Sequence, residues 1–117
     1  MAQLVRDGEN LIVRMNTKEK LESVHNDVVV AVSSVRGVDI LEDVLHAVGG
    51  IKALGGRLPG VFAFGTFISH GEKVFAVVHH GAKRGVRLRL EGEHYGSLVI
   101  GCDDPEGVVR SLNLDQH

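Results

Sequence analysis

Seven histidines among 117 residues are the first candidates for chemistry, because imidazole is the commonest side-chain ligand for metals. A helical zinc site places two histidines four residues apart, and no pair in this sequence has that spacing. His79 and His80 are neighbours on an expected strand, where consecutive side chains point to opposite faces. A zinc site built from His70, His79 or His80 with Glu72 across one hairpin stays open, but the spacing favours turn and surface histidines. We therefore predict no metal and no cofactor.

Nucleophilic chemistry has three candidate side chains, Cys102, Ser33 and Ser69. Cys102 lies in the apolar run LVIGC, where a thiol is inert unless a neighbouring group lowers its pKa. Neither serine lies in the strand-turn-helix context of a nucleophile elbow. We assign all three to packing and turns, so the sequence predicts no catalytic residue and no enzyme.

The adjacent carboxylates Asp103 and Asp104 could form an acid–base dyad. They precede Pro105, a residue preset for the first position of a helix, and Asp104 could accept from the free backbone N–H groups of the first turn. The sequence therefore favours a helix cap over a catalytic dyad.

Basic residues are grouped in two places that could hold an anion. Residues 49–60, GGIKALGGRLPG, resemble a phosphate loop in composition, but lack its Gly-Lys-Ser/Thr ending. An expected strand carries Arg87 and Arg89 on one face, and no aromatic residues are interleaved with them as nucleic-acid stacking would require. A solvated sheet face explains this stripe, but long loops often carry function. We therefore take four residues as a candidate set for an anionic ligand: Lys52, Arg57, Arg87 and Arg89.

The composition indicates one folded domain that spans residues 1–117. Apolar residues make up 44% and charged residues 24%, which is a usual globular balance. Thirteen basic and fifteen acidic residues give a net charge of −2, so the chain as a whole has no attraction to nucleic acid or anionic membranes. The single cysteine fits a reducing compartment, and charged residues interrupt every apolar run among the first fifteen residues. We expect a cytoplasmic protein without membrane insertion.

The N-terminal half alternates short strands and helices. A turn at residues 7–10 precedes the first strand, and the Ser33–Ser34 pair and Gly37 interrupt the most β-branched stretch. The expected elements are a strand at 11–15, a helix at 18–24, two strand arms at 28–32 and 35–41 joined by a bend, a helix at 42–48 and a long loop at 49–60.

The C-terminal half is expected to form a meander of four consecutive antiparallel strands. Gly-containing turns separate these strands, which are predicted at 61–69, 74–80, 86–92 and 97–103. Val86, Leu88 and Leu90 alternate with arginines, which predicts one buried and one exposed face. A closing helix that starts at Asp104 and Pro105 would cover an end or open edge of the sheet. The four phenylalanines are assigned to the core: Phe62, Phe64, Phe67 and Phe75.

Taken together, this pattern resembles a bacterial pleckstrin-homology-like (PH-like) domain. Val32 to Val38 is similar to a Ser-x-Val/Ile-x-x-Val strand of that family, and Leu98 to Leu112 is similar to its strand, Asp-Pro and helix ending. The pieces LPGV, GT and DDPE, at 58–61, 65–66 and 103–106, resemble small, uncharacterised proteins of actinobacterial type. The resemblance implies a strongly bent antiparallel sheet or partly open barrel of about seven strands with a C-terminal capping helix. Such scaffolds host binding more often than catalysis.

The sequence therefore predicts a mainly β, non-enzymatic binding or assembly module. Its expected partner is another protein or a second copy, contacted through a sheet edge or through residues 49–60. Two alternatives remain open: a binder of a small anion or headgroup that uses the four basic residues, and a metal-binding protein of hydrolase type.

Overall fold

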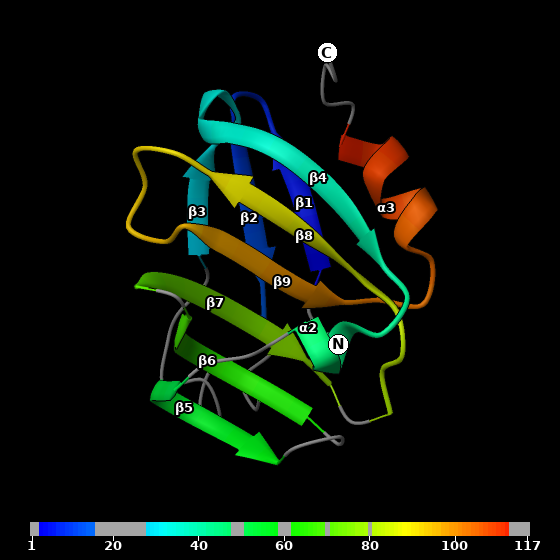
Figure 1. Cartoon of the computed structure of the whole chain (residues 1–117). Helices are drawn as coiled ribbons and strands as arrows, with labels where there is room; N and C mark the ends of the chain where they lie inside the picture. The colour runs from blue at the N-terminus through cyan, green and yellow to red at the C-terminus, as the bar shows by residue number, and fades with distance from the viewer. Residues whose placement is uncertain are drawn as a thin grey trace.

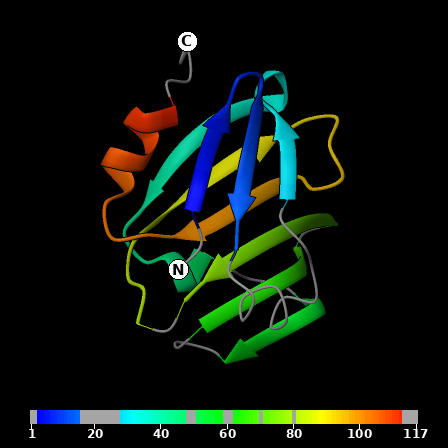
Figure 2. The same cartoon turned by 180° about the vertical axis from the view of Figure 1, so that it is seen from behind.

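The computed structural model describes residues 3–15, 28–47, 51–58, 62–69, 71–79 and 81–112 (Figure 1). In these residues the chain forms nine strands, two α-helices and one 3₁₀ turn, so the expected mainly β fold is confirmed. The strands belong to two sheets, one of three strands and one of six. Figure 2 shows the smaller sheet lying across part of the larger one.

The smaller sheet is a meander of β1 (Gln3–Asp7), β2 (Asn10–Arg14) and β3 (Val28–Ala31). Gly8 has a φ of 63°, a left-handed conformation that suits glycine in the two-residue turn between β1 and β2. The turn at residues 7–10 is therefore confirmed. The strand β1 was not predicted, because Arg6 and Asp7 leave too short an alternation of apolar residues to indicate a strand.

A bend carries the chain from the smaller sheet to the larger one. The 3₁₀ turn η1 (Val32–Ser34) separates β3 from β4 (Val35–Leu41), which confirms the two arms and the bend at the serine pair. The loop after β8 holds this corner, since the Ala31 N–H donates to a Glu93 carboxylate oxygen at 2.8 Å and the Glu91 N–H donates to the Ser34 carbonyl at 2.9 Å.

The larger sheet has the strand order β4-β8-β9-β7-β6-β5. Its further strands are β5 (Ile51–Leu58), β6 (Phe62–Ser69), β7 (Glu72–Val78), β8 (Gly85–Leu90) and β9 (Ser97–Gly101). The four C-terminal strands are confirmed, but their consecutive antiparallel order is wrong: β9 lies between β8 and β7 and pairs with β7 in parallel. All five residues of β9 are buried, and a strand that is apolar on both faces belongs in the middle of a covered sheet.

The prediction of a loop at residues 49–60 is wrong, because Ile51–Leu58 forms the strand β5. The whole segment 49–60 contains five glycines, which indicated a loop from sequence alone. In the structure β5 pairs with β6 along its length, and Gly55 lies opposite Gly65 in the register. Pairing with a neighbouring strand outweighs the low strand propensity of glycine here.

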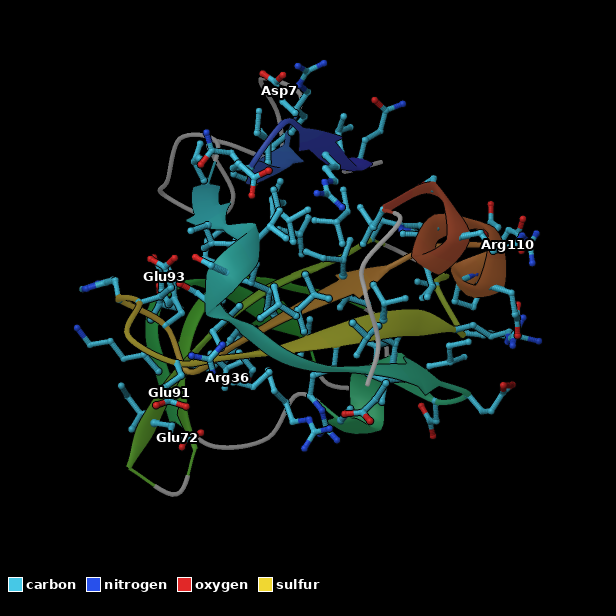
Figure 3. All side chains as sticks on the ribbon, turned by 90° about the horizontal axis from the view of Figure 1, so that it is seen from above. Asp7, Arg36, Glu72, Glu91, Glu93 and Arg110 are labelled. Carbon is cyan, nitrogen blue, oxygen red and sulfur yellow. The ribbon has the colours of Figure 1, made fainter. Side chains whose placement is uncertain are left out.

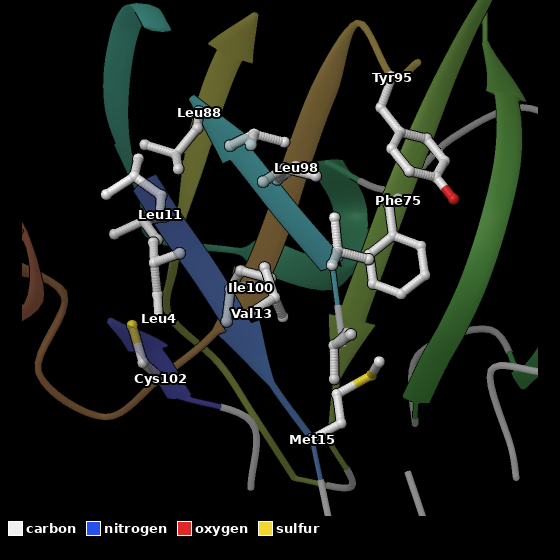
Figure 4. Close-up of a cluster of buried hydrophobic side chains, with 14 of the residues drawn as sticks. Leu4, Leu11, Val13, Met15, Phe75, Leu88, Tyr95, Leu98, Ile100 and Cys102 are labelled. Atoms are coloured by element: carbon white, nitrogen blue, oxygen red, sulfur yellow. The ribbon is translucent and has the colours of Figure 1, made fainter. Parts of the chain in front are cut away.

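The core lies on both faces of the larger sheet. On one face, Leu11 and Val13 of β2 pack against Phe75, Leu98 and Ile100 (Figure 4). On the other face, α2 (Val44–Ala47) covers a smaller cluster. That cluster includes Val44, Phe67, Ala76, Val78 and Val99. The assignment of Phe67 and Phe75 to packing is confirmed, while the side chains of Phe62 and Phe64 lie outside the described part.

The two helices agree with the sequence where the structure describes them. α2 lies within the predicted 42–48 segment, and the predicted helix at 18–24 falls outside the described residues. α3 (Pro105–Leu112) begins as expected, since the Gly107 N–H donates to Asp104 Oδ1 at 3.1 Å. This helix contacts β1, β4 and β8 and so bridges the two sheets. In the described ranges no helix is long and apolar enough to cross a membrane.

Substitution of Gly85, the first residue of β8, tests how closely α2 and β9 pack around this position. A Cβ atom at this position would overlap the carbonyl oxygen of Ile100 and lie 2.6 Å from Val44 Cγ2. Because the backbone of β9 has no room to move aside, Gly85→Ala should lower the free energy of unfolding by about 2–3 kcal/mol in chemical denaturation.

The matched control is Gly101→Ala, since Gly101 pairs with Gly85 in the register. Its Cβ would lie 3.1 Å from Ala82 Cβ and 3.3 Å from Val78 Cγ1, contacts much less tight than those at Gly85, so a smaller loss is expected. Equal losses in the two variants would contradict the packing argument.

Candidate functional site

Arg87 and Arg89 lie side by side on β8, but they already share a counter-ion. Asp39 of β4 accepts a hydrogen bond from Arg87 Nη2 at 3.2 Å through Oδ2, and the same oxygen forms an ion pair with Arg89 Nε at 3.3 Å. Asp39 stands opposite Arg87 in the strand register, so pairing of β4 with β8 creates this contact. Two guanidinium groups and one carboxylate leave a single net positive charge for any anion.

The other two predicted anion-binding residues lie elsewhere in the sheet. Lys52 and Arg57 belong to β5, opposite Phe67 and Ala63 of β6. Three strands separate β5 from β8, and four steps of about 4.8 Å make about 19 Å along the sheet. The fold therefore brings Arg87 and Arg89 together on β8, and it places the backbone of Lys52 and Arg57 four strand positions away in the sheet.

Arg84 is held by two carboxylates. Its Nη2 donates to Glu42 Oε1 at 2.8 Å and its Nη1 donates to Glu106 Oε1 at 3.0 Å. The hydrogen bonds that Arg84 donates to Glu106 and then to Glu42 raise the pKa of Arg84, and the bond to Glu106 lowers the pKa of that carboxyl group. This cation joins the segments before α2 and before β8 to the first turn of α3.

Other charged side chains are spread over the surface (Figure 3). Arg36 Nε lies 3.1 Å from Glu91 Oε2, and both side chains are exposed. Partly buried His79 directly follows β7, and exposed His94, in the loop between β8 and β9, packs edge-on against the Tyr95 ring. His70 and His80 fall outside the described residues. Within the described ranges no three His, Cys, Asp or Glu side chains are grouped as metal ligands.

Cys102 follows β9 and is buried, as the sequence predicted, with 8% of its surface exposed. Burial, followed by the charges of Asp103 and Asp104, raises the pKa of this thiol from 9.0 to about 11. The thiol is therefore protonated at neutral pH, and the more nucleophilic thiolate is scarce.

Two cavities meet at this cysteine. One, of about 450 Å³, lies between β1, the end of β9 and α3; the other, of about 210 Å³, includes Lys83 and Arg84. Cys102 and Asp103 line both. Neither cavity was predictable from the sequence, because Gln3 and Leu4 belong to β1, a strand that the sequence did not indicate, and because strand order decides which strand ends meet.

The outer edge of β5 is a third candidate site. β4 and β5 are the two edge strands of the larger sheet, and α3 contacts β4. Among the described strands, β5 pairs with β6 alone (Figure 1). An edge strand presents a row of backbone N–H and C=O groups that can pair with a further strand.

Comparisons with protein-family models, with curated proteins and with solved structures found no match to this chain. A functional inference therefore depends on the geometry of three regions: the Arg87–Arg89 pair, the cavities at Cys102 and the outer edge of β5.

Alkylation of Cys102 tests the protonated thiol. At about pH 8 its raised pKa leaves about a hundredfold less thiolate than a thiol of pKa 9.0 would have, so iodoacetamide should react at least that much more slowly than with a model thiol. The rate should rise with pH up to about 11.

The raised pKa of Cys102 also makes the stability of the fold decrease at alkaline pH. Because the folded state holds the proton more tightly, this contribution to stability is present below pH 9.0 and is lost as the pH rises through about 11. In thermal melts, Cys102→Ala should therefore show a smaller decrease in melting temperature at alkaline pH than the unchanged protein. A fast alkylation rate at neutral pH in the native protein would contradict both expectations.

Acid titration tests the pairing of Arg84 with Glu106. Because the folded state lowers the pKa of Glu106, its contribution to stability is present above 4.5 and is lost as the pH falls below that value. Arg84→Gln should therefore show a shallower decrease of melting temperature between about pH 5 and pH 3 than the unchanged protein. Arg36→Gln, which removes an exposed ion pair elsewhere, should keep the original slope; parallel profiles for all three proteins would refute the assignment.

Proposed function

We propose that this chain is a non-enzymatic binding or assembly module that accepts a further β-strand at the outer edge of β5. The observation that carries the proposal is the position of β5, an eight-residue strand that pairs with β6 alone among the described strands. Strand addition uses backbone hydrogen bonds for affinity and therefore needs no specialised side chains.

The regular part of β5 supports this role. The register shifts between Lys52 and Leu54, and from Leu54 to Leu58 the pairing with β6 continues without interruption. Bulges, prolines and short lengths normally protect sheet edges, and this stretch contains neither a bulge nor a proline. Gly55 and Gly56 lack side chains beyond Cα, so an incoming backbone can approach closely.

We also propose a cytoplasmic location and membership of the PH-like family. A net charge of −2 and one buried cysteine suit a reducing cytoplasm and give no overall attraction to nucleic acid. The resemblance to PH-like domains stays a prediction, and it favours the same class of function. The occupant that can be tested directly is the β5 strand of a second copy.

Residue-resolved hydrogen exchange tests strand addition at β5. As the protein concentration rises from about 10 μM to about 1 mM, every second amide between residues 54 and 58 should become protected, because only alternate N–H groups face away from β6. Sedimentation should show dimers over the same range.

Two proline variants provide matched controls, since successive amides point to opposite sides of a strand. Of Gly55→Pro and Gly56→Pro, one removes a donor to β6 and should destabilise the fold. The other removes only an outward donor, and it should remain folded yet monomeric. A monomer at the highest concentration, with no change in β5 protection, would overturn the proposal.

A further inference from the structure

The cavity of about 450 Å³ beside α3, here called the α3 cavity, has the size of a small-molecule site. Protein interiors leave few voids larger than one water, whereas ligand sites range from about 300 to 1,000 Å³. Leu4 of β1, Ile100 of β9 and Val108 of α3 provide apolar walls. Leu4 and Ile100 are buried, so the cavity reaches the main core.

One polar group inside this region lacks a partner. Cys102 lines the α3 cavity and is more than nine-tenths buried, and no described residue forms a hydrogen bond with its thiol. A protonated thiol is polarizable and makes favourable contacts with aromatic rings. The inner part of the cavity therefore suits an apolar or aromatic group.

The outer part of the α3 cavity is acidic. Asp103 and Asp104 line it, and within the described residues nothing forms an ion pair or hydrogen bond with Asp103. Asp104 caps the helix through Gly107, and Glu106 lies in the first turn, so the positive end of the helix dipole already has two carboxylates. Lys83 and Arg84 line the smaller cavity together with Asp103; Arg84 is held by Glu42 and Glu106, and within the described residues Lys83 forms no ion pair with Asp103. The carboxylate of Asp103 is thus left to attract a cation.

We propose that the α3 cavity binds a small amphipathic amine, with its apolar group against Leu4, Ile100 and Val108 and its ammonium group at Asp103. The ammonium stays at the exposed rim, where it keeps part of its hydration, and only the apolar group is fully removed from water. This site lies beside β1 and β9, and β5 is at the far edge of the larger sheet. Amine binding and strand addition can therefore succeed or fail independently.

Three probes that share a phenyl ring test the charge preference: phenethylamine, 2-phenylethanol and 3-phenylpropionate. Each is titrated into ¹⁵N-labelled protein while backbone amide shifts are recorded. Phenethylamine should move the amides of Gly107, Val108 and Ser111 in a saturable way. The alcohol should bind at least about fivefold more weakly and the carboxylate more weakly still, because only the amine gains from the Asp103 charge.

Three variants assign the effect to the α3 cavity. Asp103→Asn should reduce the affinity for phenethylamine to that for the alcohol and leave the alcohol unchanged. Ser111→Phe, which fills the cavity from α3, should abolish binding of both. Glu91→Gln removes an exposed carboxylate that pairs with Arg36 away from the cavity, and should change neither affinity.

Three results would overturn the proposal. They are equal affinity for the three probes, shifts that do not saturate or that centre outside α3, and an affinity for phenethylamine that Asp103→Asn leaves unchanged. Any of them would leave the strand-addition proposal standing, because its readout is protection of β5 amides and the mass of the assembly.

Discussion

Burial of β9 on both faces is the constraint on which the rest of this fold depends. Leu98 and Ile100 face the smaller sheet, and Val99 faces the cluster under α2. A strand with apolar groups on both sides is stable only between two covered faces. Among the described elements, the smaller sheet covers one face of β9 and α2 covers the other.

The same constraint places the candidate sites. With β9 in the middle, β8 and β4 form one side of the sheet and β6 and β5 the other. The cations of β8 are then close to Asp39 of β4 and far from those of β5. The end of β9 leads directly into Asp103, Asp104 and α3, so the acidic groups meet the apolar core next to β1.

Local signals in the sequence predicted local structure well. The alternation of Val86 and Leu88 with arginines matches a strand whose apolar side chains are buried, and Asp104 and Pro105 mark the start of α3. Order in the sheet was not predictable in this way, because β9 follows β8 in the sequence yet also pairs with β7. The strand β5 was missed since its glycines indicate a turn until β6 lies beside it. The α3 cavity forms where β1 meets the end of β9 and α3, which are far from β1 in sequence, so no single segment could reveal it.

The corner at η1 limits how this molecule can open. Three residues, Val32–Ser34, join the two sheets covalently, so at that corner β3 and β4 are unable to separate. At the C-terminal end of α3, Arg6 Nη1 of β1 donates to the Leu112 carbonyl at 3.1 Å, and the same helix also contacts β4 and β8. Separation of the two sheets therefore requires α3 to lose its contacts with one of them. A molecule bound in the α3 cavity would oppose that motion and slow the exposure of the core to solvent and proteases.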